Sequence, residues 1–184
     1  METMQAVFGR KSYRGGFTGA PVPREDLREI MEAGLAAPSG HNLQTTQLIG
    51  VDDPELLRRL ADCFPHSGMT TAGAMVVVLA KKIQCEDGAF YHVEDFAAAT
   101  ENMLLAIHDK GYASVWLQGV IRGGSPPPGW RPSWACPGRL RWWYACPSAS
   151  PPVPSGRRPR PPLRTGPGST AIRSDPGKED AGLF

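Results

Sequence analysis

The stretch from Tyr91 to Lys110 reads YHVEDFAAATENMLLAIHDK. Its apolar residues return every three or four positions over about five turns, which is the period of an α-helix with one buried stripe. Gly111 follows at once, and glycine is the residue that most often ends a helix. The stretch therefore predicts a long core helix over about 91–110.

Further elements are predicted on both sides of this helix. Helical spacing indicates a short helix that ends near Gly9, a second one between Pro23 and Pro38, and a third that begins at Asp53-Pro54. Apolar or β-branched runs predict strands at 46–51, 75–79 and 113–117. This order is typical of an α/β or α+β domain with two packed layers.

Length and composition limit the class of protein. A chain of 184 residues suits a single core, and its longest apolar run, Ala74 to Ala80, falls far short of the ~20 residues of a membrane helix. The N-terminus lacks the basic and apolar regions of a secretory signal. The four cysteines form no Cys-x-x-Cys pair, so we expect free thiols and a cytoplasmic location.

Composition changes sharply after residue 122. Residues 1–122 hold five of the 19 prolines, with 11 Lys and Arg against 15 Asp and Glu. Residues 123–184 hold the other 14 prolines, with 9 basic against 3 acidic residues and few large aliphatic ones. We therefore expect a domain at 1–122 and an irregular or disordered tail at 123–184. A basic, proline-rich tail would also suit a non-catalytic interaction protein.

Four of the five tryptophans lie in this tail, which is unusual for a solvated segment. Tryptophan has one codon, so Trp142-Trp143-Tyr144 can also be translated out of phase. Started on the third base of each codon, the stretch from Trp142 to Pro151 gives a pattern typical of a β-strand followed by a turn. The hypothesis is that a one-base insertion or deletion near Gly123 put the tail out of frame.

Two segments carry groups that suit a ligand. Arg10, Lys11, Ser12 and Arg14 follow the first helix, and their cations and hydroxyl suit a phosphate, although a solvated basic turn has the same composition. The loop from Pro38 to Gln44 offers backbone N–H groups and amides to a planar heterocycle, although its residues are also common in turns.

The sequence predicts neither a metal site nor a catalytic side chain. Cys63-x-x-His66 is the nearest approach to a ligand pair, and no second pair stands at ligand spacing. Asp95 and Glu101 on the long helix are expected to be solvated or cap-pairing groups rather than an acid/base pair.

Taken in order, four motifs resemble the nitroreductase family of flavin mononucleotide (FMN) enzymes. They cover about residues 3–121. The motifs are 10–14 (RKSYR), 37–44 (APSGHNLQ), Asp95 with 101–106 (ENMLLA), and 111–119 (GYASVWLQG).

The resemblance implies an α+β fold, with a central sheet flanked by helices, in a homodimer that holds flavin at its interface. It also implies that NAD(P)H delivers hydride to flavin N5 and that a small acceptor then takes the electrons by a ping-pong mechanism. We expect neither nucleic acid nor membrane as a partner. The implied FMN-binding residues are Arg10, Lys11, Ser12, Arg14, Pro38, Ser39, Gly40, Asn42, Gln44, Gln118 and Gly119.

Within that set the resemblance gives each group a place. Arg10 and Ser12 would hold the phosphate and ribityl chain, and Arg14 would approach the pyrimidine edge. The loop residues would come from the other subunit, and Gln118 with Gly119 would lie near N5.

The sequence departs from the family at two places. Thr45-Thr46 stands where the family often has proline and an aromatic residue. The basic residue that closes the family's phosphate site after a C-terminal strand has no counterpart in the given frame. An inactive remnant of a nitroreductase is therefore an alternative.

We expect that resequencing the coding DNA will reveal a one-base insertion or deletion near Gly123. An uninterrupted frame from Met1 to Phe184 in an independent isolate would remove the hypothesis.

Overall fold

The structure, a computed structural model, describes residues 1–63, 69–117 and, as backbone, 140–148. Its helices are α1 (Thr3–Gly9), α2 (Arg24–Leu35), α3 (Pro54–Cys63) and α4 (His92–Asp109), with short 3-10 helices η1 (Gly40–Asn42) and η2 (Met69–Thr71). Its strands are β1 (Thr46–Val51), β2 (Met75–Lys81), β3 (Ala113–Leu117) and β4 (Leu140–Ser148). The long core helix and the three strands expected before residue 118 are confirmed, and the fold is α+β.

The strands form one sheet in the order β1-β2-β4-β3, and every neighbouring pair is antiparallel. Strand β2 is central, since Val77 pairs with Ile49 of β1 on one side and with Tyr144 of β4 on the other. Alternate side chains of a strand point to opposite faces, and those of β2 enter two different cores. A strand that is buried on both faces needs the unbroken apolar run that the sequence shows.

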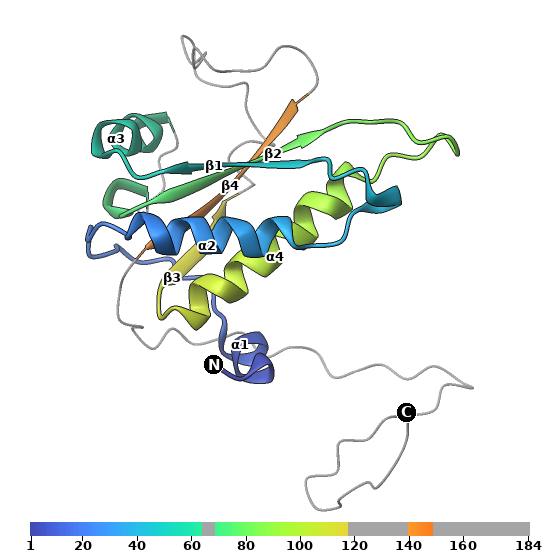
Figure 1. The fold of residues 1–184 in the computed structure, drawn as a ribbon. Helices are drawn as coiled ribbons and strands as arrows, with labels where there is room; N and C mark the ends of the chain where they lie inside the picture. The colour runs from blue at the N-terminus through green and yellow to red at the C-terminus, as the bar shows by residue number, and fades with distance from the viewer. Residues whose placement is uncertain (64–68, 118–139, 149–184) are drawn as a thin grey trace, which may run out of the picture.

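Helices α2 and α4 lie side by side across one face of the sheet (Figure 1). Ile30, Phe96 and Ile107 pack there against the even-numbered residues of β2. The two helices approach closely at Gly34, where an added Cβ would lie 2.7 Å from Met103 Cγ. The odd-numbered residues of β2 join the second core with α3, η2 and Phe17.

Strand β4 differs from the expectation that the chain after residue 122 is irregular. At Leu140–Ser148 the structure has a strand instead, and it lies between β2 and β3. The composition of residues 123–184 as a whole did not indicate a strand here, although the aromatic run at 142–144 favours extended backbone. The strand supplies the hydrogen-bonding partner that β2 requires on its second edge. The frame hypothesis and the division at residue 122 stay predictions, and residues 118–139 and 149–184 lie outside the described residues.

No helix in the described part of the chain is both long enough and apolar enough to cross a membrane.

A polar cluster ties the end of α4 to the start of α2. Lys110 Nζ donates to Asp26 Oδ1 at 2.7 Å and also pairs with Glu29, while the Tyr112 hydroxyl donates to Asp26 Oδ2. These hydrogen bonds, from Lys110 first and then Tyr112, lower the pKa of Asp26 below its ordinary 3.8. The Asp26 side chain is 28% exposed, so water screens part of the attraction.

The variant Asp26→Asn should lower the melting temperature by a few degrees at pH 7. A carboxyl whose pKa falls on folding stabilises the folded state above its unfolded value, and the gain is lost as the pH falls through the folded pKa. Thermal unfolding should therefore show the gap between variant and wild type closing below about pH 4. Glu32→Gln, which breaks a more exposed pair on the same helix, is the control and should change less. A gap that persists unchanged at pH 3 would contradict this account.

Candidate functional site

A buried carboxylate organises the loop that connects α2 to β1. Asp95 lies in the first turn of α4 and is 3% exposed. Its Oδ1 accepts a hydrogen bond from the Gly40 backbone N–H at 2.7 Å, and its Oδ2 accepts one from the Thr45 hydroxyl at 2.6 Å. Asp95 was expected to be a solvated or cap-pairing group. It is instead buried, and it fixes both ends of the segment 40–45.

The loop closes on itself by further hydrogen bonds. The Gln44 N–H donates to Ser39 Oγ at 3.0 Å, and the Asn42 N–H donates to the Ser39 carbonyl at 3.0 Å. His41, Asn42 and Gln44 all have left-handed backbone, with φ of 51°, 53° and 47°. Such conformations cost of order 1–3 kcal/mol each and persist where the surroundings impose them, often at ligand sites.

Glycine is required at position 40. A Cβ added there would overlap the ring of Tyr91 at the start of α4. The loop backbone therefore rests directly on α4, and Gly40 can reach Asp95 only because it has no side chain.

A cavity of about 240 Å³ opens beside this loop. Its wall consists of residues from α2, the loop, β1 and α4: Gly34, Leu35, Ala37, Pro38, Ser39, Gln44, Thr46, Asp95 and Ala99. The Thr46 hydroxyl is buried and has no hydrogen-bond partner among the described residues. Sites for small organic ligands usually hold ~300–1,000 Å³, so this cavity forms only part of one. A larger cavity of about 490 Å³ lies along β1, and none of the predicted site residues lines it.

The basic segment after α1 lies beside β3. Ser12 forms a parallel bridge with Ser114, and the Tyr13 N–H donates to the Ser114 carbonyl at 2.8 Å. Lys11, Ser12 and Arg14 are exposed. The sheet edge therefore supports a segment whose polar side chains face outward.

Arg10 differs from its neighbours because it is largely buried. Its side chain is 17% exposed, and Nε lies 3.1 Å from Glu101 Oε1 on α4. That contact is an ion pair without the alignment of a hydrogen bond, and the buried Nε has no hydrogen-bond partner among the described residues. Glu101 is thus a partner of Arg10, and its own side chain remains exposed at 49%.

Within one chain, the two predicted segments contact α4 at different heights. The loop is bound at Asp95 and the basic segment at Glu101, six residues and roughly 9 Å farther along the helix axis. Gln118 and Gly119 lie outside the described residues. The hydrogen bonds of Asp95 could not be predicted from sequence spacing, because its two partners lie 50 and 55 residues away.

Asp95→Ala should destabilise the fold by roughly 2–5 kcal/mol, since it leaves two donors without an acceptor. Asp95→Asn should cost less, because an amide oxygen still accepts from Gly40 while the Thr45 hydroxyl can turn to accept. Urea unfolding measures the free energy of unfolding of each variant, and hydrogen exchange at the Gly40 amide should accelerate most in Asp95→Ala. Equal exchange rates in both variants and the wild type would show that Asp95 does not hold the loop.

Comparison with known proteins agrees with this architecture. The sequence model of the nitroreductase family matches residues 7–65. A protein of Archaeoglobus fulgidus, provisionally named NADH dehydrogenase/NAD(P)H nitroreductase, is 34% identical over 117 residues, which are 63% of this chain and 67% of that protein. A protein of Methanothermobacter thermautotrophicus with the same provisional name is 26% identical over 63% of this chain and 60% of its own length. The chain thus spans about two thirds or less of these curated relatives.

Solved structures extend the likeness to the fold. A protein of Desulfovibrio desulfuricans, provisionally called a nitroreductase and solved in complex with FMN, is 29% identical with a TM-score of 0.68, over 86% of this chain and 92% of that one. NfrA1 of B. megaterium has a TM-score of 0.71 at 19% identity, over 88% and 71% of the two chains, and shows the fold alone. The resemblance inferred from the four motifs is confirmed, and the chain belongs to the nitroreductase family.

Proposed function

We propose that this chain is an FMN-dependent oxidoreductase of nitroreductase type, which uses NAD(P)H to reduce a nitroaromatic, a quinone or a similar small acceptor. The Desulfovibrio relative was solved with FMN, and relatives carry names of NAD(P)H nitroreductases. Family membership supports the class of reaction, and the chain's own residues support the cofactor.

The buried Nε of Arg10 carries the proposal. This Nε is buried, and its contact with Glu101 at 3.1 Å lacks hydrogen-bond alignment. Burial of a donor that is not hydrogen-bonded costs free energy, which an acceptor on a ligand would recover. Phosphate oxygens, like those of a carboxylate, match the arrangement of guanidinium donors. Arg10 therefore fits the phosphate of FMN, with Glu101 holding its side chain in place.

The neighbouring residues suit the rest of the cofactor. Ser12, fixed against β3, would bind the ribityl chain with Lys11 nearby, and Arg14 would lie at the pyrimidine edge of the ring. A cation there stabilises negative charge on the reduced ring.

The loop at Pro38–Gln44 would pack on the flavin of a second subunit. Its small residues and fixed backbone would form this wall of the site, in which Pro38, Ser39, Gly40, Asn42 and Gln44 take part. The cavity beside it is smaller than an organic cofactor requires. A homodimer in which one chain provides the phosphate contacts and the other this wall would complete the site, with Gln118 and Gly119 near N5.

No acid or base of the chain is needed for the transfer. When bound, FMN would supply the redox chemistry, namely transfer of hydride from NAD(P)H through N5 to the acceptor by a ping-pong mechanism. The protein's share is binding, orientation and charge: Arg10 and Ser12 anchor the phosphate end, and the loop fixed by Asp95 covers the ring.

The full chain should bind FMN, and Arg10→Met should weaken that binding by about 10- to 150-fold, the equivalent of one charge-assisted contact of ~1.5–3 kcal/mol. Quenching of flavin fluorescence measures the affinity, and NAD(P)H consumption with a quinone measures turnover. Arg28→Met is the matched control, since Arg28 makes only exposed pairs on α2.

A chain that stays monomeric and takes up no FMN would contradict the proposal. It would favour the inactive remnant, or the interaction protein if the tail binds a partner.

A further inference from the structure

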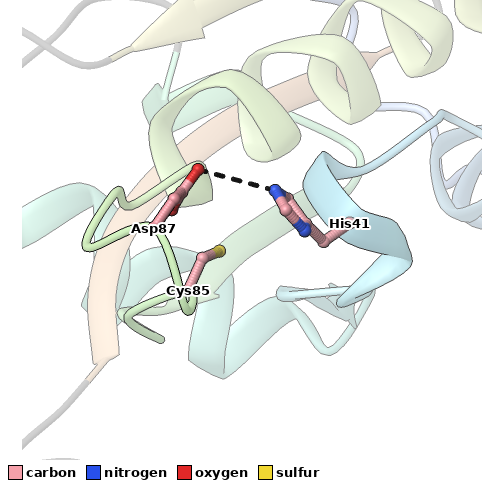
Figure 2. A group of neighbouring side chains, drawn as sticks. All are labelled: His41, Cys85 and Asp87. Atoms are coloured by element: carbon pink, nitrogen blue, oxygen red, sulfur yellow. Dashed lines mark ion pairs between the residues drawn. The ribbon is translucent and has the colours of Figure 1, made fainter.

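Three side chains with metal-binding atoms meet at the start of α4. They are His41 from η1, and Cys85 and Asp87 from the turn between β2 and α4 (Figure 2). One ring nitrogen, the thiol sulfur and one carboxylate oxygen all lie within 4.8 Å of one another. None of the three belongs to the residues assigned to FMN.

The turn holds the carboxylate and the thiol in place. Asp87 Oδ1 accepts from the Ala89 N–H at 2.9 Å, and Oδ2 accepts from the Tyr91 hydroxyl at 3.1 Å. The Cys85 N–H donates to the Ala89 carbonyl at 2.9 Å, so the turn closes around Gly88. Hydrogen bonds of this kind orient ligands in metal sites.

The histidine is positioned by the loop described above. His41 has left-handed backbone, and its neighbour Gly40 is bound to Asp95. Its ring packs on Tyr91, with ring centres 5.4 Å apart, and its Nε2 lies 3.7 Å from Asp87 Oδ2. Tyr91 thus contacts both the imidazole and the carboxylate.

The set matches the preference of zinc. Zn²⁺ takes thiolate, imidazole and carboxylate ligands at about 2.0–2.3 Å in a tetrahedron, which places the ligand atoms roughly 3.3–3.6 Å apart. The His41–Asp87 separation of 3.7 Å is already close to that. All three atoms lie within 4.8 Å of one another, so side-chain rotation that brings the sulfur closer would complete the set. Two of the residues are exposed and Cys85 is half-buried, so an ion can enter and water can take the fourth position.

We propose that His41, Cys85 and Asp87 form a binding site for a divalent transition metal ion, with Zn²⁺ as the ion that fits best. The ion would join η1 to the turn before α4. Sequence spacing did not indicate this group because its members lie in two loops 44 residues apart in the chain. The inference does not depend on FMN binding.

The same three residue types also form nucleophilic sites, but the thiol here does not suit that role. Burial, followed by the charges of Asp87 and Asp95, raises the pKa of Cys85. A nucleophilic cysteine needs the opposite shift. A bound cation, in contrast, displaces the thiol proton directly, and the carboxylates that disfavour a free thiolate then help to balance the charge of the ion.

The test is a titration of the full chain with Co²⁺ after removal of metals by a chelator. One equivalent should bind with a thiolate-to-cobalt charge-transfer band, and Zn²⁺ should displace it. Cys85→Ser should abolish the band, and His41→Ala and Asp87→Asn should weaken Zn²⁺ binding about tenfold or more in competition with a chelating dye. Glu86→Gln, an exposed carboxylate between two ligands, is the matched control and should bind like wild type.

A charge-transfer band that survives in Cys85→Ser would place the metal on other thiols and overturn the proposal, as would unaltered affinity in His41→Ala. Circular dichroism of each metal-free variant checks the fold. Because His41 is exposed, His41→Ala should fold, and its affinity decides the question if Cys85→Ser does not. Titrations with and without added FMN show whether the metal binds independently of FMN, so failure of one proposal can be distinguished from failure of the other.

Discussion

The carboxylate of Asp95 is the contact on which the functional part of this fold depends. A charged group with 3% exposure is tolerated only when hydrogen bonds replace its lost water, and here a backbone N–H and a hydroxyl do so. Because both donors belong to the segment 40–45, the solvation of one buried charge also determines the shape of a loop. The left-handed residues of that loop stay in place for this reason.

Helix α4 carries this arrangement because it is fixed along its whole length. Its apolar stripe packs on β2 and α2, so its polar residues occupy set positions at the rim of the core. Asp95 organises the loop near the helix start, Glu101 pairs with Arg10 in the middle, and Lys110 follows the end and binds α2. One helix thus aligns the cavity and the cationic segment, and both come from parts of the chain distant in sequence.

Most elements of this fold could be predicted from the sequence because they have regular periods. The apolar residues of α4 recur every three or four positions because one face of the helix is buried. The apolar run of β2 is continuous because both faces of the strand are buried. Strand β4 was not predicted, because the proline-rich composition of the whole segment 123–184 concealed its aromatic run and because pairing with other strands completes its extended form. The part played by Asp95 and the meeting of His41 with Cys85 depend on contacts between loops, which sequence spacing does not record.

The place of β4 in the sheet has a consequence for the order of folding. β1 and β2 pair directly, and with α2 and α4 they already enclose an apolar core. β3 reaches β2 only through β4, although β3 precedes β4 in the chain. Contacts between distant residues form slowly because a long loop must first close. On the ribosome, β2 therefore keeps an open edge, and β3 stays outside the sheet, until residues 140–148 have emerged. During this interval the nascent chain is most exposed to wrong strand pairing.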